Sequence, residues 1–273
     1  MGSEKRRVVI TGLGAVTAIG NNVEQYWEGL HQGTCGIRPI TVFDCLNYRV
    51  KNAAEVSDFD PRKYFDGRCL KRTSRTDRFA LVAALEAIND ATSGKGLGSL
   101  GIDAHEIAIS FGASAAGQLS GERYYRDLCQ KGNGRLSDII PYIACTTTDV
   151  IANEFNLLGP RTTIVTACSS SNTAIAWGAD WIKDGRATVA IVGGADSLCE
   201  LTFGGFNSLR SVDPDKCKPF SKNRLGLSVG EGAGILLLEE YEHARARGAV
   251  VHAEFLGVGY SADAHHMTAP TDN

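Results

Sequence analysis

The sequence predicts an α/β layered domain with a mostly parallel sheet. Short apolar runs typical of strands alternate along the chain with stretches whose apolar residues recur at helical spacing. The chain has 273 residues, 43% of them hydrophobic, so it can bury a large core. Glycine and proline clusters mark the loops, and no low-complexity linker interrupts the alternation.

Each expected element follows from a local pattern. Runs rich in valine, isoleucine and other β-formers predict strands at 8–10, 107–111, 163–166, 189–192 and 234–238. Apolar residues at helical spacing predict helices at 23–30, 77–91 and 173–182. Loops are expected where glycines and prolines gather, at 132–135 and 212–219.

Charge and composition argue against several classes of function. A net charge of -3 gives no reason to expect binding to nucleic acid or to an anionic membrane. No apolar run approaches the length of a membrane span, and the basic N-terminal stretch lacks the apolar core of a signal peptide. The eight cysteines show neither a CxxC pair nor zinc-like spacing, which favours reduced thiols, a cytoplasmic protein and no metal site.

Cys168 is the most informative single residue. It lies where the strand-like run around Val165, expected to be buried, stops and the alanine-rich helical stretch 172–183 begins. The free N–H groups and positive dipole end of a helix N-terminus favour a thiolate, which would make Cys168 a nucleophile. A cysteine in an apolar run is also often buried and inert. The local spacing alone leaves both interpretations open.

Gly12-Leu13-Gly14 follows an N-terminal strand and could indicate a nucleotide-binding loop. No third glycine follows at the dinucleotide spacing, and no acidic residue closes a second strand at the expected place. A nucleotide site is therefore not expected.

Several motifs occur in a fixed order along the chain. They are VVITGLGAVTAIGN (8–21), SRTDRF (74–79), TACSS (166–170), VGGAD (192–196), KPFSKNR (218–224) and GEGAG (230–234). In this order and spacing the sequence resembles the β-ketoacyl-[acyl carrier protein] synthases, the elongating ketosynthases of fatty-acid synthesis and their polyketide relatives. The resemblance runs from Val8 to the last residue.

The resemblance implies the thiolase-like layered fold, in which two similar halves pack with their sheets between helices. Residues 1–250 would form the first, N-terminal half. Residues 251–273 would begin the second half, with an opening strand at 251–260, and the sequence stops there. A truncated chain or a split gene is then expected. The family also implies a homodimer, with the missing C-terminal half or a complementary subunit as a further partner.

The chemistry implied by the resemblance has two stages. An acyl group passes from an acyl carrier protein thioester to Cys168; malonyl carrier then loses carbon dioxide, and its carbanion attacks the acyl-cysteine. Substrates arrive on the carrier's phosphopantetheine arm, so no cofactor is expected. The family's two histidines and lysine belong to the second half. The adjacent His265 and His266 are not expected to replace them, because the matching family segment lines the entrance for that arm.

Other residues receive roles only through the resemblance. Phe206 would wall the acyl pocket, unless it is an ordinary core phenylalanine. Ala115, in the small-residue loop 112–117, would leave a roomier pocket than a larger aliphatic residue. His266 and Thr268 would line the pantetheine entrance. The basic residues expected to meet the acidic carrier are Lys71, Arg75 and Arg210, with Arg72 and Arg78 as competitors.

Alternative functions stay open at this stage. The Cys-Ser-Ser-Ser run is also common in polyketide ketosynthases, so a polyketide or specialised-lipid pathway competes with fatty-acid synthesis. The presence of Cys168 argues against the chain-length-factor subunits, which lack the nucleophile. A non-condensing partner subunit and a cysteine hydrolase are the remaining alternatives, although no histidine stands in a convincing general-base context.

Overall fold

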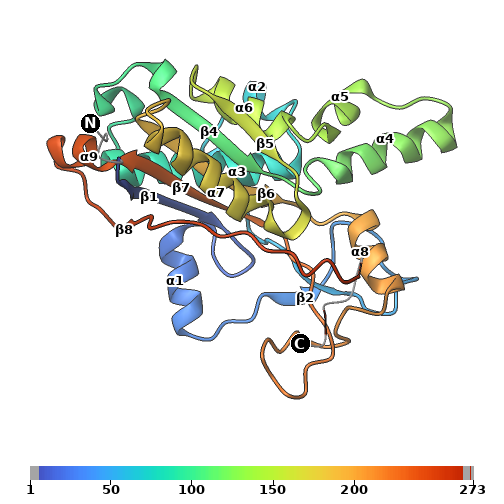
Figure 1. Cartoon of the computed structure of the whole chain (residues 1–273). Helices are drawn as coiled ribbons and strands as arrows, with labels where there is room; N and C mark the ends of the chain where they lie inside the picture. Colours follow the sequence, from blue (N-terminus) through green and yellow to red (C-terminus); the bar gives the residue numbers. More distant parts are fainter. Residues whose placement is uncertain (1–5, 267–270, 272–273) are drawn as a thin grey trace.

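The computed structural model of the chain describes residues 6–266 and residue 271. Its centre is a six-stranded sheet in the order β5-β4-β6-β7-β1-β8 (Figure 1). The strands are β1 (Val8–Val16), β4 (Ile107–Gly112), β5 (Arg161–Ile164), β6 (Val189–Asp196), β7 (Gly232–Glu240) and β8 (Ala253–Glu254). A separate two-stranded sheet pairs β2 (Ile37–Pro39) with β3 (Asn52–Ala54).

The sheet is mixed rather than mostly parallel by pairing. β4 pairs in parallel with β5 and β6, whereas β7 pairs antiparallel with both β6 and β1. Strands β5, β4, β6 and β1 therefore run in one direction, and β7 enters between β6 and β1 in the opposite one. The segment 197–231 connects β6 to β7 and lets β7 run antiparallel to β6. Hydrophobic periodicity carries no information on strand direction, so the sequence pattern did not predict this reversal.

One helix layer covers each face of the sheet, as expected for a layered α/β fold. Helix α3 (Arg75–Thr92) packs on β1, β7 and β6, and α6 (Thr146–Glu154) packs beside it, while α7 (Ser170–Lys183) lies on the opposite face over β6 and β4 (Figure 1). Along β6, Ile191 faces the core under α3 and its neighbour Val192 faces the core under α7. Because both faces are covered, the central strands are mostly apolar on both sides.

The glycines of β1 explain one motif. A Cβ atom at Gly12 or Gly14 would overlap the carbonyl oxygen of Ala87 or Ala83 in α3. Both glycines are therefore needed for the close approach of α3 to the sheet. The Gly12-Leu13-Gly14 motif thus has a packing role.

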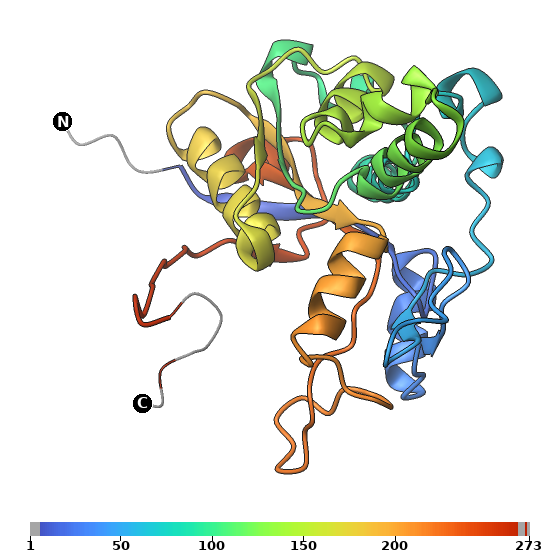
Figure 2. The ribbon, with the colours of Figure 1, turned by 90° about the vertical axis from the view of Figure 1, so that its right-hand side faces the viewer.

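The remaining elements surround this core. They are α1 (Val23–His31), α2 (Gly67–Leu70), α4 (Gln118–Lys131), α5 (Leu136–Ile139), α8 (Glu200–Ser208), α9 (Tyr241–Ala246) and short 3₁₀ turns at Pro61–Lys63, Leu97–Leu100, Ala104–Glu106, Ile140–Tyr142 and Ala167–Ser169. Helix α8 and the loop after it extend away from the sheet (Figure 2). No helix in the described part of the chain is both long enough and apolar enough to cross a membrane.

The segment expected to open a second half forms little regular structure. Of the predicted strand 251–260, only Ala253 and Glu254 are in a strand, β8, which pairs with the outer side of β1. The described residues 255–266 are in no helix or strand, and Leu256 is 88% exposed. The division of the chain near residue 250 stays a prediction.

A buried carboxylate joins the strands β1 and β7 to α9. The Glu239 side chain is fully buried and accepts hydrogen bonds from the Thr11 hydroxyl at 2.7 Å and from Arg247 at 2.6 and 2.7 Å. His243 Nδ1 lies 2.6 Å from the same carboxylate. Burial alone would raise the pKa of Glu239, but the hydrogen bonds from Arg247 and Thr11 and the charge of Arg247 outweigh it and hold the pKa below its usual value.

Glu239→Gln should therefore lower the free energy of unfolding at pH 7 by about 3 kcal/mol, because Arg247 would lose its carboxylate partner. The folded-state pKa of Glu239 is lowered, so its contribution is present above the unfolded-state pKa and is lost as the pH falls through the folded-state pKa. Urea unfolding measured as a function of pH checks both points.

The exposed pair of Glu242 with Arg245 supplies the control, and Glu242→Gln should change stability by less than about 1 kcal/mol. Equal stability of Glu239→Gln and the wild type at pH 7 would show that the buried cluster is not stabilising.

Candidate active site

Cys168 lies in a 3₁₀ turn, Ala167–Ser169, that joins β5 to α7. The Ser170 hydroxyl donates to the carbonyl oxygen of Ala167 at 2.7 Å and accepts the N–H of Thr166 at 2.9 Å. The Ser169 hydroxyl donates to the carbonyl oxygen of Thr166 at 2.9 Å. The serines after the cysteine therefore hold the turn that presents it.

The backbone before Cys168 adopts an uncommon conformation. Ala167 has a φ of 51°, in the left-handed region that residues with a Cβ atom rarely enter. Helix α7 begins two residues after Cys168, at Ser170, so the predicted position at a helix start is confirmed. The chain passes from the end of β5 at Ile164 to the start of α7 at Ser170 within five residues, and the left-handed conformation of Ala167 makes this sharp turn.

The prediction of a buried strand around Val165 was wrong. Strand β5 ends at Ile164, and Val165 is 56% exposed. The reason is topological, because β5 is an outer strand with only β4 beside it in the described part of the sheet. Residues 165–169, including Cys168, are all exposed.

The eight cysteines, none in a disulfide, differ in their surroundings. Cys199 is buried, and burial raises the pKa of its thiol. Burial, together with a hydrogen bond and the negative charge of Glu154, raises the pKa of Cys69 to about 12. Exposed thiols occur at Cys35, Cys129, Cys145 and Cys168. Of these, Cys145 is the N-cap of α6, whereas Cys168 stands in the turn after β5 that follows the strained residue Ala167.

The start of α7 lies against the carboxyl ends of the parallel strands. A Cβ atom at Gly112, the last residue of β4, would lie 2.5 Å from the backbone of Ser170 and Ser171. A Cβ atom at Gly194 in β6 would overlap the Ser171 hydroxyl. An open hollow of about 360 Å³ reaches Ser171 and is lined also by Asp196 and the glycine-rich segment 230–234.

Asp196, at the end of β6, was missed as a site residue by sequence reasoning. Its carboxylate accepts the backbone N–H groups of Ala115 and Ala116 at 2.7 and 2.8 Å and that of Ser114 at 3.1 Å. Burial raises the pKa of Asp196, although the three N–H groups oppose that shift. The available signal was an acidic residue directly after a buried strand, in the VGGAD motif.

Asp196 thus fixes the loop that carries Ala115. Thr76 in α3 holds the same loop from the other side, since its hydroxyl bonds to the carbonyl oxygen of Ala116 and lies 2.9 Å from the Ser197 hydroxyl. Ala116 has a φ of 42°, so the loop keeps a conformation that needs such support.

Phe206 is half-buried on α8. The core of that region is filled instead by Phe203, which packs against Phe43 and Tyr48. Phe206 is therefore not an ordinary core phenylalanine.

The three basic residues predicted to meet a carrier differ in environment. Lys71 and Arg210 are exposed. Arg75 is half-buried and donates to the Glu231 carboxylate at 2.6 to 3.1 Å and to the carbonyl oxygen of Val56 at 2.8 Å. The carboxylate of Glu231 is fully buried, so Arg75 also has a structural role.

The remaining predicted residues lie near the C-terminal end of the chain. His265 and His266 are exposed, in a stretch after β8 without helix or strand. Thr268 lies outside the described residues. In the part of the chain that the structure describes, no group of three or more His, Cys, Asp or Glu side chains is arranged to hold a metal ion.

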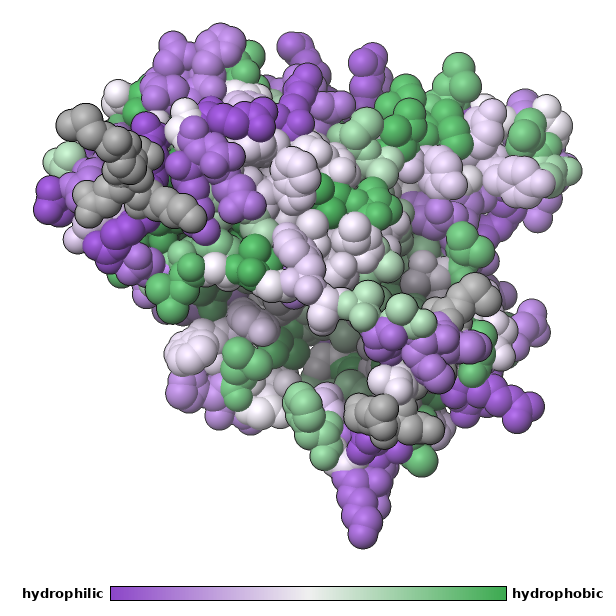
Figure 3. All heavy atoms as spheres, in the orientation of Figure 1, coloured by the Kyte–Doolittle hydropathy of each residue, from purple (hydrophilic) through white to green (hydrophobic). Residues whose placement is uncertain are grey.

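Apolar side chains are also exposed on the two segments that flank the Cys168 turn, at Val165 before it and on α7 after it. Trp177 on the outer side of α7 is 47% exposed, and Figure 3 shows apolar residues distributed over the face of the molecule that carries this helix. The candidate site is therefore an open surface, in which Cys168 has no histidine within hydrogen-bond distance among the described residues.

Comparison with known proteins agrees with this geometry. The family model described as Beta-ketoacyl synthase, N-terminal domain, matches residues 5–244. The chain is 39% identical to 3-oxoacyl-[acyl-carrier-protein] synthase 2 of Synechocystis sp., over 98% of this chain and 65% of that protein. The chain thus spans somewhat less than two thirds of that relative's length.

Solved structures of ketosynthases share the fold. The ishigamide ketosynthase/chain length factor matches with a TM-score of 0.89 and 35% identity, over 98% of this chain and 66% of that chain. A type II PKS ketosynthase in complex with its acyl-carrier protein matches with a TM-score of 0.79 and 25% identity, over 92% of this chain and 62% of that one. The predicted thiolase-like layered fold is confirmed, and the chain belongs to the β-ketoacyl synthase family, of which it carries the N-terminal domain.

Proposed function

We propose that this chain supplies the acyl-accepting nucleophile, Cys168, of a 3-oxoacyl-[acyl carrier protein] synthase that acts in fatty-acid synthesis. The observation that carries the proposal is the exposed thiol in a strained turn at the start of α7, beside the carboxyl ends of β4 and β6. Condensation would be completed by the C-terminal half of the synthase or by a complementary subunit.

In the first step, the thiolate of Cys168 attacks the thioester carbonyl of an acyl carrier, and the carrier's phosphopantetheine thiolate leaves. The Cys168 N–H has no hydrogen-bond partner among the described residues, so it is free to donate to the oxyanion of the tetrahedral intermediate. The positive end of α7 supports the same negative charge.

In the second step, malonyl carrier loses carbon dioxide, and the resulting carbanion attacks the acyl carbonyl on Cys168. The new carbon–carbon bond forms as the bond to sulfur breaks, which returns the thiolate. Proton handling in this step needs the two histidines that the family carries in its second half, whereas His266 and Thr268 of this chain are assigned to the pantetheine entrance. All substrates are carrier-bound, and the chemistry needs no cofactor.

The proposed partners are an acidic carrier protein and a second ketosynthase subunit. Lys71 and Arg210 are exposed and suit encounter with the carrier, and Arg75 adds a positive charge that is shared with Glu231. A homodimer is supported by β5, whose outer edge has no partner strand in the described part of the sheet. Eight free cysteines are consistent with the proposed cytoplasmic location.

A polyketide or specialised-lipid ketosynthase is the second candidate function, because two structural relatives are the ishigamide and type II PKS ketosynthases. In that case Ala115 and Phe206 would line a pocket for a polyketide or specialised-lipid acyl chain, and Cys168 would still be the residue that is acylated. A cysteine hydrolase would release free acid, whereas a non-condensing subunit would not be acylated. Incubation with acyl carrier and analysis of the intact protein mass separates these outcomes.

Cys168 should be acylated by acyl carrier thioester and should react fastest with iodoacetamide near pH 7. Its exposed thiol lies at the start of α7 in the turn that follows the strained residue Ala167, and its own N–H, unpaired among the described residues, is free to stabilise the charge that develops there. Peptide mass mapping of the wild type and Cys168→Ala measures both. Cys145→Ser is the matched control, since Cys145 is exposed at the start of α6. Equal labelling of Cys168, Cys145 and Cys129 would remove the basis for the nucleophile assignment.

Asp196→Ala should destabilise the chain by about 1 to 3 kcal/mol, because the N–H groups of 114–116 lose their acceptor. In the completed synthase it should also broaden the range of acyl lengths accepted, since Ala115 would no longer be fixed. Asp196→Asn keeps one acceptor oxygen, so its stability and its range of acyl lengths should lie between those of the wild type and Asp196→Ala. Urea unfolding and product chain-length profiles are the measurements, and an unchanged profile in Asp196→Ala would contradict the positioning role.

Lys71→Glu with Arg210→Glu should weaken carrier binding several-fold at low salt, with a smaller deficit at high salt, because exposed pairs are each worth about 0.2 to 1 kcal/mol and are screened. Calorimetry with the completed synthase measures it. The control is Arg186→Glu. Arg186 is exposed and precedes β6, at the end of the strand away from Asp196, so this variant should bind the carrier as the wild type does. Unchanged affinity of the double variant at low salt would place the docking surface elsewhere.

A further inference from the structure

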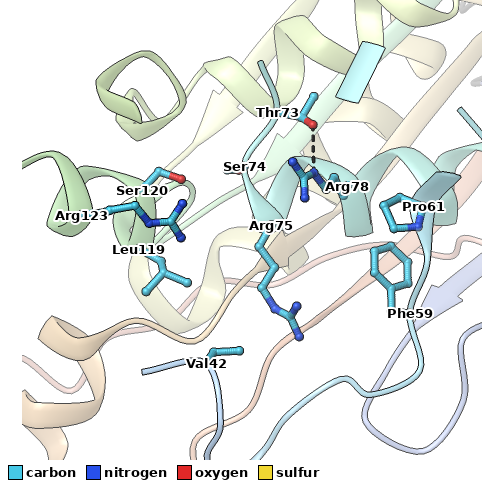
Figure 4. A pocket seen from close by; sticks show the side chains of 10 residues that line it. All are labelled: Val42, Phe59, Pro61, Thr73, Ser74, Arg75, Arg78, Leu119, Ser120 and Arg123. Atoms are coloured by element: carbon cyan, nitrogen blue, oxygen red, sulfur yellow. Dashed lines mark hydrogen bonds between the residues drawn. The ribbon is translucent and has the colours of Figure 1, made fainter. Parts of the chain in front are cut away.

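A pocket of about 260 Å³ lies between the start of α3 and helix α4. Three arginines line it, together with hydroxyl side chains and a few apolar ones: Arg75, Arg78, Arg123, Thr73, Ser74, Ser120, Val42, Phe59, Pro61 and Leu119. Figure 4 shows the guanidinium groups of Arg78 and Arg123 directed toward each other from α3 and α4, while Arg75 points away from them.

The positive charge of this pocket is only partly balanced. Arg75 is paired with the buried carboxylate of Glu231. Arg78 is half-buried and donates only to neutral oxygens, the Thr73 hydroxyl and the Leu70 carbonyl, both at 3.2 Å. Arg123 is exposed and forms neither a hydrogen bond nor an ion pair with any described residue.

The nearest carboxylate on α3 forms no ion pair with Arg78. Asp77 attracts Arg78 electrostatically, but its oxygens accept the Ser74 N–H and the Thr147 hydroxyl, both at 2.7 Å. Burial lowers the pKa of Arg78, and the positive charges of Arg123 and Arg75 act in the same direction. Two guanidinium groups therefore face one pocket with no carboxylate hydrogen-bonded to either of them among the described residues, and an anion between them would offset both burial and repulsion.

We propose that this pocket binds a phosphate group, either as the free dianion or as the end of a small phosphate monoester. Planar guanidinium groups match the oxygens of a phosphate in a two-pronged geometry, and a dianion balances the two cations. Ser120, on the α4 side of the pocket, offers a hydroxyl donor beside Arg123 (Figure 4). The proposal does not depend on the acylation of Cys168.

The test is calorimetric titration of the 273-residue chain in chloride buffer with inorganic phosphate, and separately with glycerol 3-phosphate. Both ligands should bind if the pocket recognises a terminal phosphate, and inorganic phosphate alone should bind if it encloses the free ion. Arg123→Gln and Arg78→Gln should each weaken binding about tenfold or more, because each removes a charged hydrogen-bond donor.

Arg135→Gln is the matched control, since it removes an exposed arginine from the neighbouring α4–α5 connection and should bind as the wild type does. Cys168→Ala should also bind normally, which separates this site from the proposed catalytic role. Arg123 is exposed, so Arg123→Gln should keep the wild-type circular dichroism. Absence of phosphate binding at millimolar concentration, equal binding by Arg123→Gln, or equal binding of acetate would overturn the proposal.

Discussion

The position of Cys168 depends on how closely the start of α7 packs against the ends of β4 and β6. Gly112 and Gly194 leave no side chain between the sheet and the first residues of the helix. Further along, Gly178 gives α7 the same close contact with Val192. With the helix held directly on the sheet, the preceding turn projects past the strand ends, and its residues are exposed. Packing density beneath the helix thus determines where the thiol lies.

Two carboxylates hold the loops at the same end of the sheet. Asp196 ends β6 and pairs in register with Gly232, directly after Glu231, because β7 runs antiparallel to β6. Asp196 binds the N–H groups of one loop, and Glu231 binds those of Val56 and Leu198 together with Arg75. Buried carboxylates with several N–H donors fix irregular backbone that has no regular partner. The loops around the candidate site are therefore held by two carboxylate side chains, one at the end of β6 and one directly before β7.

The sequence predicted the order and type of the main elements because both faces of the sheet are covered, which makes strands and helix faces apolar. It predicted the turn at Cys168 for the same reason, since a strand pattern changes there to a helical one. The exposure of Val165 and the direction of β7 depend on sheet order, which no local pattern contains. The role of Asp196 depends on residues 80 to 82 positions away, and the Arg75–Glu231 pair joins residues 156 positions apart.

The exposure of Cys168 places a chemical requirement on the proposed reaction. An acyl-cysteine on an open surface is accessible to water, which would compete with a carrier-bound carbanion for the same carbonyl carbon. A carbanion is also protonated quickly in water, so carbon–carbon bond formation requires exclusion of solvent. The apolar residues that α7 and the turn leave exposed, Trp177 and Val165, are suited to burial under a covering protein surface. Under this proposal the same cover would exclude water and bring the proton-transfer groups to the thioester.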